Sequence, residues 1–282
     1  MIAGEPVLEA RELAKRYGRK VWALGGIDLA LPAGGITALV GPNAAGKSTL
    51  IKTWVGFEKP TRGSVRVAGI DPWKNRSDAL AQLGYVPQSP SLYDGLSVED
   101  HLDLARQLRP GFDRDYARNR MAQLDIPADR GARNLSGGQQ AQVALAIALG
   151  TRAPILLLDE PLASLDPLAR REFLHVLTDA VRSDGATALL SSHIVTDVEQ
   201  ACDRLIVLGV GKVLLHETVA AALEGHAISS TPHPDAVGNF GAPDGSRLYL
   251  VRGTADRPAT LDEVVLGYLA SGRAVPASAA AA

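Results

Sequence analysis

The feature that most constrains this chain is a glycine-rich loop between an apolar strand and a helix. Residues 41–48 (GPNAAGKS) match the pattern G-x-x-x-x-G-K-[ST] at every fixed position. The apolar run Ile36–Val40 before the loop predicts a buried strand, and residues 47–55 after it predict a helix. Such a loop wraps backbone N–H groups around a phosphate, and the helix N-terminus adds partial positive charge. The sequence therefore predicts a nucleotide-phosphate site in an α/β fold.

Two side chains of this loop have defined roles in phosphate chemistry. Lys47 is predicted to reach the terminal phosphates, and Ser48 to offer its hydroxyl to Mg²⁺. The loop alone leaves kinases, GTPases, helicases and transport ATPases open. No guanine-reading N-K-x-D occurs in the chain, which disfavours a GTPase.

Apolar strands alternate with helical segments along the rest of the chain. Strand-like runs lie at 7–13, 27–31, 63–69, 155–158 and 186–192, helical patterns at about 92–124, 134–149 and 167–182, and a hairpin at 204–215. This alternation predicts a mostly parallel α/β sheet. After Glu224 the sequence becomes turn-rich, and we expect one strand (248–252), one helix (261–270) and a disordered tail (AVPASAAAA).

Composition excludes several classes of partner and location. The 282 residues carry a formal net charge of −2, so no basic surface for nucleic acid or anionic lipid is expected. The single cysteine, Cys202, is consistent with a reducing cytoplasm. No apolar run approaches the ~18 residues of a membrane helix, and the first residues lack a signal-peptide pattern. We therefore expect a soluble chain that works at a membrane only through another chain.

A second glycine motif, residues 135–139 (LSGGQ), begins a predicted helix. Two adjacent glycines destabilise a helix by about 1 kcal/mol each. Their presence is explained if a ligand must approach the backbone closely. Ser136 can cap the helix, and the free N–H groups form a second anion site. Because Lys47 already serves a terminal phosphate, this second site is free for a nucleotide held by another copy. The alternative interpretation is a glycine-rich helix cap.

With this pentapeptide the chain resembles the ATP-binding cassette (ABC) family, whose signature it matches in full. The other family motifs occur in order over roughly residues 7–223. They are Tyr17 as the adenine-stacking aromatic, Gln88 as the Q-loop glutamine, residues 155–160 (ILLLDE) as Walker B, residues 164–166 (SLD) as the D-loop, and His193 as the switch histidine.

The resemblance implies a P-loop NTPase fold with a mostly parallel core sheet, an antiparallel β subdomain and an inserted helical subdomain at about 90–150. Residues 1–224 would form the ATPase domain and 225–282 a small C-terminal extension. It implies ATP and Mg²⁺ as cofactors, with Glu160, His193 and Gln88 catalytic, and Ser48, Gln88 and Asp159 near the metal. The implied nucleotide contacts are Tyr17, Gly41, Pro42, Asn43, Ala44, Ala45, Gly46, Lys47, Ser48, Thr49, Leu135, Ser136, Gly137, Gly138, Gln139, Asp159 and Asp166.

The chain departs from the family pattern in two places. Most members carry glycine where this chain has Ala44, and a β-carbon there costs about 1–3 kcal/mol if the backbone needs a positive φ. The family usually continues with basic residues after the signature, whereas Gln140, Ala141 and Gln142 follow here. The second departure lowers the positive charge beside the predicted two-chain site and leaves its turnover rate open.

The resemblance implies the ATP-binding subunit of an ABC transporter of the bacterial export type. It would pair with a second ATPase chain and an integral membrane permease, on the cytoplasmic face of the membrane. The segment 89–108 resembles the region that contacts the permease. The alternative is a soluble ABC ATPase acting on DNA or ribosomes, but the 89-residue separation of Lys47 and Ser136 leaves no room for a long coiled coil. The cargo, the choice of homodimer or heterodimer, and the role of residues 225–282 remain open.

Overall fold

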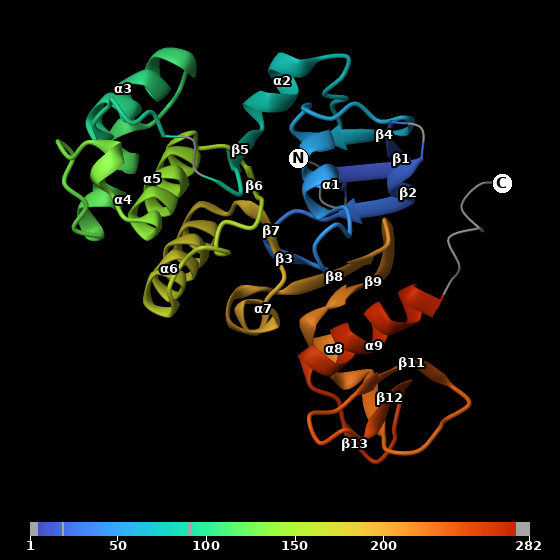
Figure 1. Cartoon of the computed structure of the whole chain (residues 1–282). Helices are drawn as coiled ribbons and strands as arrows, with labels where there is room; N and C mark the ends of the chain where they lie inside the picture. Colours follow the sequence, from blue (N-terminus) through green and yellow to red (C-terminus); the bar gives the residue numbers. More distant parts are fainter. Residues whose placement is uncertain (1–4, 19, 90–91, 275–282) are drawn as a thin grey trace.

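The computed structural model describes residues 5–18, 20–89 and 92–274. Within these ranges the chain forms three β-sheets, with most of the helices packed around the central sheet. Figure 1 shows a group of helices at one end of the molecule, the central sheet in the middle and a small C-terminal sheet at another end.

The central sheet is mostly parallel, as the alternation of strands and helices predicts. Its strands, in spatial order, are β5 (Leu83–Val86), β6 (Ile155–Leu158), β7 (Thr187–Ser192), β3 (Gly35–Val40), β8 (Arg204–Gly209) and β9 (Lys212–Thr218). The first five run parallel, and β8 and β9 form the predicted antiparallel hairpin. Because β6, β7 and β3 are neighbours, the loops after these three strands meet at one edge of the sheet, where ligands of parallel sheets bind.

A three-stranded antiparallel sheet covers one face of the central sheet, with a helix between the two. Its strands are β2 (Val21–Leu31), β1 (Leu8–Tyr17) and β4 (Arg62–Val67), and the helix is α1 (Lys47–Trp54). Leu50, Ile51 and Trp54 of α1 belong to a buried apolar cluster that includes residues of both sheets. The Trp54 indole N–H donates to the Glu9 carbonyl at 2.9 Å, which ties α1 to β1. The packing fixes the direction in which the start of α1 points.

The opposite face of the central sheet is covered by α5 (Gly137–Gly150) and α6 (Pro167–Asp184). A shorter helix, α7 (Val195–Ala201), follows β7 and packs with residues of β3 and β8. Pro167 at the first turn of α6 needs no N–H partner there, and Asp166 caps the helix by accepting from the Leu168 and Ala169 N–H groups, both at 3.0 Å.

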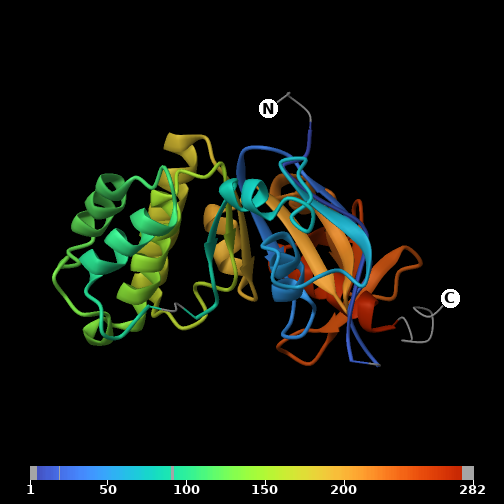
Figure 2. The same cartoon turned by 90° about the horizontal axis from the view of Figure 1, so that it is seen from above.

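The helical insert contains α3 (Val98–Leu108) and α4 (Arg114–Gln123), which pack on α5 around their own apolar core. The predicted helical stretch 92–124 is therefore two helices. Pro110 explains the break, because a proline disfavours helical geometry in the preceding residue, and Arg109 is indeed extended. A further short helix, α2 (Arg76–Ala81), precedes β5 and was not predicted. Figure 2 shows the helical insert standing apart from the β-rich part of the molecule.

The C-terminal region contains more regular structure than the turn-rich sequence predicts. After α8 (Val219–Glu224), strands β11 (Ala236–Gly241), β12 (Arg247–Arg252), β10 (His226–Ser229) and β13 (Arg257–Pro258) form a four-stranded antiparallel sheet. Only β12 was predicted as a strand. Glycines interrupt the pattern of β11, while β10 and β13 are only four and two residues long, too short to show alternation. The predicted final helix is α9 (Leu261–Ala274), whose Leu261, Val264 and Val265 share an apolar cluster with β3 and β8.

None of the helices within the described ranges is long and apolar enough to cross a membrane. The predicted disordered tail lies, from residue 275 onward, outside the described residues. The division of the chain at residue 224 stays a prediction.

Candidate nucleotide site

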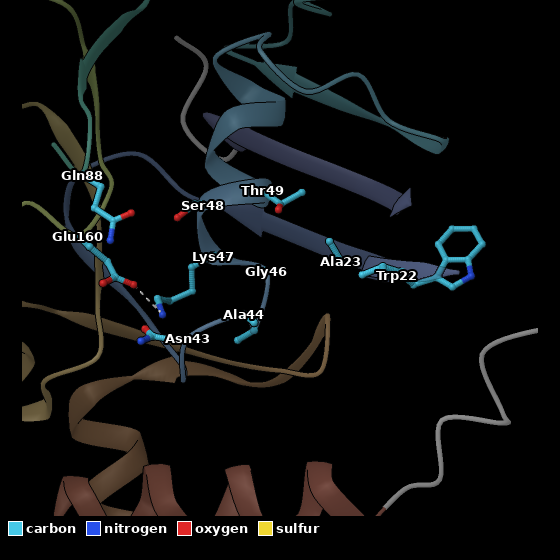
Figure 3. Close-up of a pocket in the computed structure, with 12 residues that line it drawn as sticks. Trp22, Ala23, Asn43, Ala44, Gly46, Lys47, Ser48, Thr49, Gln88 and Glu160 are labelled. Atoms are coloured by element: carbon cyan, nitrogen blue, oxygen red, sulfur yellow. Dashed lines mark ion pairs between the residues drawn. The ribbon is translucent and has the colours of Figure 1, made fainter. Parts of the chain in front are cut away.

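The loop after β3 forms one wall of a cavity of about 420 Å³ (Figure 3). The cavity is lined by Val21, Trp22, Ala23, Asn43, Ala44, Ala45, Gly46, Lys47, Ser48, Thr49, Gln88 and Glu160. Two loop glycines have no room for a β-carbon, since one on Gly41 would lie 2.2 Å from the Leu208 carbonyl oxygen and one on Gly46 would lie 2.5 Å from that of Ala23. These close approaches explain the two fixed glycines of the motif.

Ala44 adopts the left-handed backbone conformation that favours glycine, with a φ of 66°. The sequence analysis attached a cost to the β-carbon of Ala44 if its φ is positive, and this condition is met. A non-glycine residue in this region stores about 1–3 kcal/mol of strain. Ala44 lies within a turn that is closed by a hydrogen bond from the Ala45 N–H to the Pro42 carbonyl oxygen at 3.1 Å, which helps to hold this conformation.

We expect Ala44→Gly to stabilise the protein. Glycine relieves the strain of about 1–3 kcal/mol, while its greater freedom in the unfolded chain offsets about 0.4–1 kcal/mol, so the free energy of unfolding should rise by about 1 kcal/mol. Ala45→Gly is the matched control, because Ala45 is buried without a positive φ and its truncation should lower stability. Urea denaturation measures both variants, and a loss of stability in Ala44→Gly would contradict the assigned strain.

Lys47 is the buried cation of the cavity, with 3% of its surface exposed. Its ammonium donates to the carbonyl oxygens of Gly41 at 2.6 Å and Pro42 at 3.1 Å. It also forms an ion pair with Glu160, 2.9 Å from Oε1 (Figure 3). Gly41 and Pro42 thus contribute carbonyl groups that hold Lys47, and they are absent from the cavity lining.

Glu160 lies between two basic groups. Its Oε1 contacts Lys47, and its Oε2 lies 3.3 Å from His193 Nδ1. Glu160 is buried and has a φ of 46°, so its backbone is also strained. Its N–H donates to Ser191 Oγ at 2.8 Å. The structure therefore brings together three residues that lie after three different strands, as the predicted motifs require.

Asp159 is the second carboxylate of this edge, and it faces Ser48. The Ser48 hydroxyl donates to Asp159 Oδ1 at 2.8 Å, and the Ser191 hydroxyl donates to the same oxygen at 3.2 Å. Burial raises the pKa of Asp159, while the hydrogen bonds from Ser48 and Ser191 act in the opposite direction. Ser191 was missed by the sequence analysis, because its run (TALLSS) carries only the pattern of a buried strand.

The remaining predicted residues of this site lie around the cavity. Gln88 lines it from the segment after β5, and Thr49 from α1. Tyr17 is absent from the lining, and its hydroxyl lies 3.5 Å from Thr49 Oγ1. Trp22, which the sequence analysis missed, belongs to the lining, although Figure 3 shows its ring directed away from the loop. The stacking role of Tyr17 stays a prediction.

The LSGGQ residues occupy a different place from the phosphate loop. Ser136 caps α5 by accepting from the Gln139 N–H at 3.2 Å, and the Gln139 side chain accepts in return from the Ser136 N–H at 3.1 Å. Ser136, Gly138, Gln139 and Asp166 line a second cavity of about 150 Å³, which shares no lining residue with the first. Leu135 is buried in the core of the helical insert.

The two signature glycines differ in their surroundings. A β-carbon on Gly138 would lie 3.0 Å from that of Ala169, so tight packing of α5 on α6 explains this glycine. A β-carbon on Gly137 would meet no atom of the described residues within 4 Å. Packing within the described residues therefore does not explain why position 137 is a glycine. A ligand that approaches the start of α5 closely would explain it.

Comparison with known proteins identifies the family. The family model described as "ABC transporter" matches residues 24–163. The lipoprotein-releasing system ATP-binding protein LolD 1 of Rhodospirillum rubrum is 37% identical over 209 residues, which cover 70% of this chain and 92% of that protein. The chain belongs to the ABC family of ATPases.

Other members match a similar share of this chain. The probable multidrug ABC transporter ATP-binding protein YbhF of Escherichia coli is 35% identical over 216 residues, 74% of this chain, but the match spans only 37% of the length of that relative. The dimeric structure of the cassette MJ0796 bound to ADP and Pi aligns with this chain with a TM-score of 0.68 and 25% sequence identity. The alignment covers 75% of this chain and 98% of the MJ0796 chain. Matched relatives include proteins named for phosphonate import and for lipopolysaccharide export.

Proposed function

We propose that this cassette binds ATP in the 420 Å³ cavity and hydrolyses it. The observation that carries the proposal is the meeting of Lys47, Glu160, Ser48 and Asp159 at the edge of the sheet where the phosphate loop ends. A buried ammonium and a row of loop N–H groups suit the phosphates, and a buried carboxylate beside them suits the activation of water.

The donor set beside the loop fits Mg²⁺. The Ser48 hydroxyl and the Asp159 carboxylate lie 2.8 Å apart, so one small cation can contact both, and Gln88 adds an amide to the same cavity. Oxygen ligands of this kind are those that Mg²⁺ prefers, together with waters and phosphate oxygens. When bound, the ion would neutralise charge on the phosphates.

Hydrolysis requires Lys47 to change partner. Lys47 is paired with Glu160 at 2.9 Å, so binding the terminal phosphates requires it to leave Glu160. Glu160 is then free to accept a proton from a water whose oxygen attacks the γ-phosphorus, while the bond from phosphorus to the β-phosphate oxygen breaks and ADP leaves. His193, whose Nδ1 lies 3.3 Å from Glu160 Oε2, is the group that we expect to contact the γ-phosphate. As a general base, Glu160 would raise the hydrolysis rate by about 10²–10⁴-fold.

The complete site contains two chains. The signature and the phosphate loop of one chain line separate cavities, so neither can surround a nucleotide alone. A second cassette facing the first head to tail would place its Ser136 and Gly137 against the terminal phosphate, with Asp166 nearby. The dimeric MJ0796 structure supports this arrangement. Because both motifs are present in this chain, two identical copies suffice.

The work that ATP drives is transport through a separate membrane permease. The transporter names of the relatives support this partner. We assign the direction as export, which rests on the single cassette with its short insert and small C-terminal extension. The cassette then lies at the cytoplasmic face of the membrane. A DNA- or ribosome-bound ATPase is the second candidate, and the net charge of −2 disfavours it.

Affinity purification of the tagged chain from its native cells tests this partner. We expect a multi-span membrane protein to copurify from detergent extracts, in equal amount with the cassette, and to raise its ATPase rate. A preparation that instead carries ribosomes or DNA, with no membrane protein, would contradict transport. A detergent extract with an unrelated tagged cytoplasmic protein is the control for nonspecific capture.

A further inference from the structure

Two adjacent serines end strand β7, directly before His193, and the predicted motifs assign them no role. Both are almost fully buried, with 1% of Ser191 and 4% of Ser192 exposed. Neighbouring residues of a strand point to opposite faces of the sheet, so the two hydroxyls cannot serve the same partners. Buried hydroxyls are costly unless hydrogen-bonded, which makes their contacts informative.

The Ser191 hydroxyl connects the two carboxylate residues at the end of β6. It accepts from the Glu160 N–H at 2.8 Å and donates to Asp159 Oδ1 at 3.2 Å, so its single hydrogen and one lone pair are both used. The Glu160 backbone has a strained φ of 46°. A strained residue keeps its conformation only when its surroundings hold it, and the bond to Ser191 supplies part of that restraint.

The Ser192 hydroxyl holds the segment that carries His193. It accepts from the Ile194 N–H at 3.0 Å, and two acceptors, Asp197 Oδ2 and the Ile194 carbonyl oxygen, each lie 3.3 Å away. Asp197 is itself buried, and burial raises its pKa while the nearby Arg170, Ser192 and His193 oppose that rise. The residues on both sides of His193 are thus bonded to each other, which fixes where its imidazole leaves the backbone.

We propose that Ser191 and Ser192 are positioning residues, Ser191 for Glu160 and Ser192 for His193. One strand end thereby sets the relative placement of the base and the histidine, which lie 3.3 Å apart. Neither serine lines the nucleotide cavity, so neither contacts the loop-bound phosphates. Loss of such supporting partners reduces activity by about 10- to 100-fold in other sites. The proposal rests on the proposed ATPase function.

The test is a set of four double-mutant cycles, with each serine variant made in two backgrounds. Ser191→Ala and Ser192→Ala should each lower kcat about 10- to 100-fold, with KM for ATP and calorimetric ATP affinity unchanged. In single-turnover assays Ser191→Ala should cause no further loss in a Glu160→Gln background, yet keep its full effect in a His193→Ala background. Ser192→Ala should cause no further loss in a His193→Ala background, yet keep its full effect in a Glu160→Gln background. A residue that only stabilises the fold would multiply its effect in both backgrounds.

A second readout needs no nucleotide. Removing Ser192 Oγ leaves the Ile194 N–H without its acceptor, and removing Ser191 Oγ does the same to the Glu160 N–H, so hydrogen exchange at those amides should accelerate. Ser271→Ala, on α9, is the matched control, since its hydroxyl donates to the Tyr268 carbonyl far along the chain from this site. Should Ser191→Ala fail to fold, Ser191→Cys keeps the volume with a weaker donor and should show the same loss.

The outcomes separate the two proposals. A wild-type chain without Mg²⁺-dependent ATP hydrolysis would overturn the proposed function. An active wild type with Ser191→Ala and Ser192→Ala as fast as Ser271→Ala, or with losses that multiply fully in both backgrounds, would overturn the positioning role alone.

Discussion

Glu160→Gln should lower the ATP hydrolysis rate by about 10²–10⁴-fold, the usual contribution of a general base. ATP affinity should rise at the same time, because Lys47 no longer has to leave an anionic partner at 2.9 Å before it binds phosphate. Since the bound ATP persists, the two-chain complex should accumulate. Phosphate release measures the first effect, calorimetry the second, and size-exclusion chromatography with and without ATP the third.

Two further variants give this prediction its controls. Glu224→Gln changes an exposed glutamate on α8 and should leave hydrolysis unchanged. Ser136→Arg, added to Glu160→Gln, places a bulky side chain at the signature and should prevent the ATP-dependent dimer while ATP binding persists. Normal hydrolysis by Glu160→Gln would show that another group activates the water.

Lys47→Ala should remove most of the ATP affinity. Truncating one member of a buried charge pair costs about 2–5 kcal/mol, a factor of about 30 to several thousand in affinity. The loss has two parts here, because the variant lacks the phosphate-binding ammonium and leaves the Glu160 carboxylate facing the triphosphate without its neutralising partner. Isothermal titration calorimetry with ATP and Mg²⁺ measures the change.

Lys74→Ala is the matched control for this substitution. Lys74 is exposed and lies outside the cavity lining, so its removal should leave affinity unchanged. A Glu160 carboxylate without its Lys47 partner also lowers the stability of the fold. The thermal unfolding of both variants should therefore be measured together with the titration. Tight ATP binding by a folded Lys47→Ala would refute the assignment of the phosphate loop.

Several parts of the fold could not be predicted from local pattern. The strands β10 and β11 lie in a segment rich in glycine and proline, and they form because β12 offers pairing edges on both sides. The break between α3 and α4 does have a local signal in Pro110, but helical periodicity on both sides of the proline obscures it. For β10 and β11 the deciding interaction is the pairing with β12.

The site shows the same division between local and distant information. The fixed glycines, Lys47, Ser48, Asp159 and Glu160 belong to short motifs whose residue types follow from phosphate and carboxylate chemistry, so the sequence alone predicts them as site residues. Their convergence on one edge depends on the strand order β6-β7-β3, which pattern does not encode.

The sequence by itself determined the class of the fold and the family, and it predicted which residues surround a nucleotide, because each of these rests on recognisable motifs. Only the tertiary structure decided that Lys47 is paired with Glu160, that Ala44 and Glu160 are strained, and that Ser191 links Asp159 to Glu160. The reason is physical: a hydrogen bond, an ion pair or a backbone angle depends on which strands become neighbours, and this emerges only when the whole chain has packed.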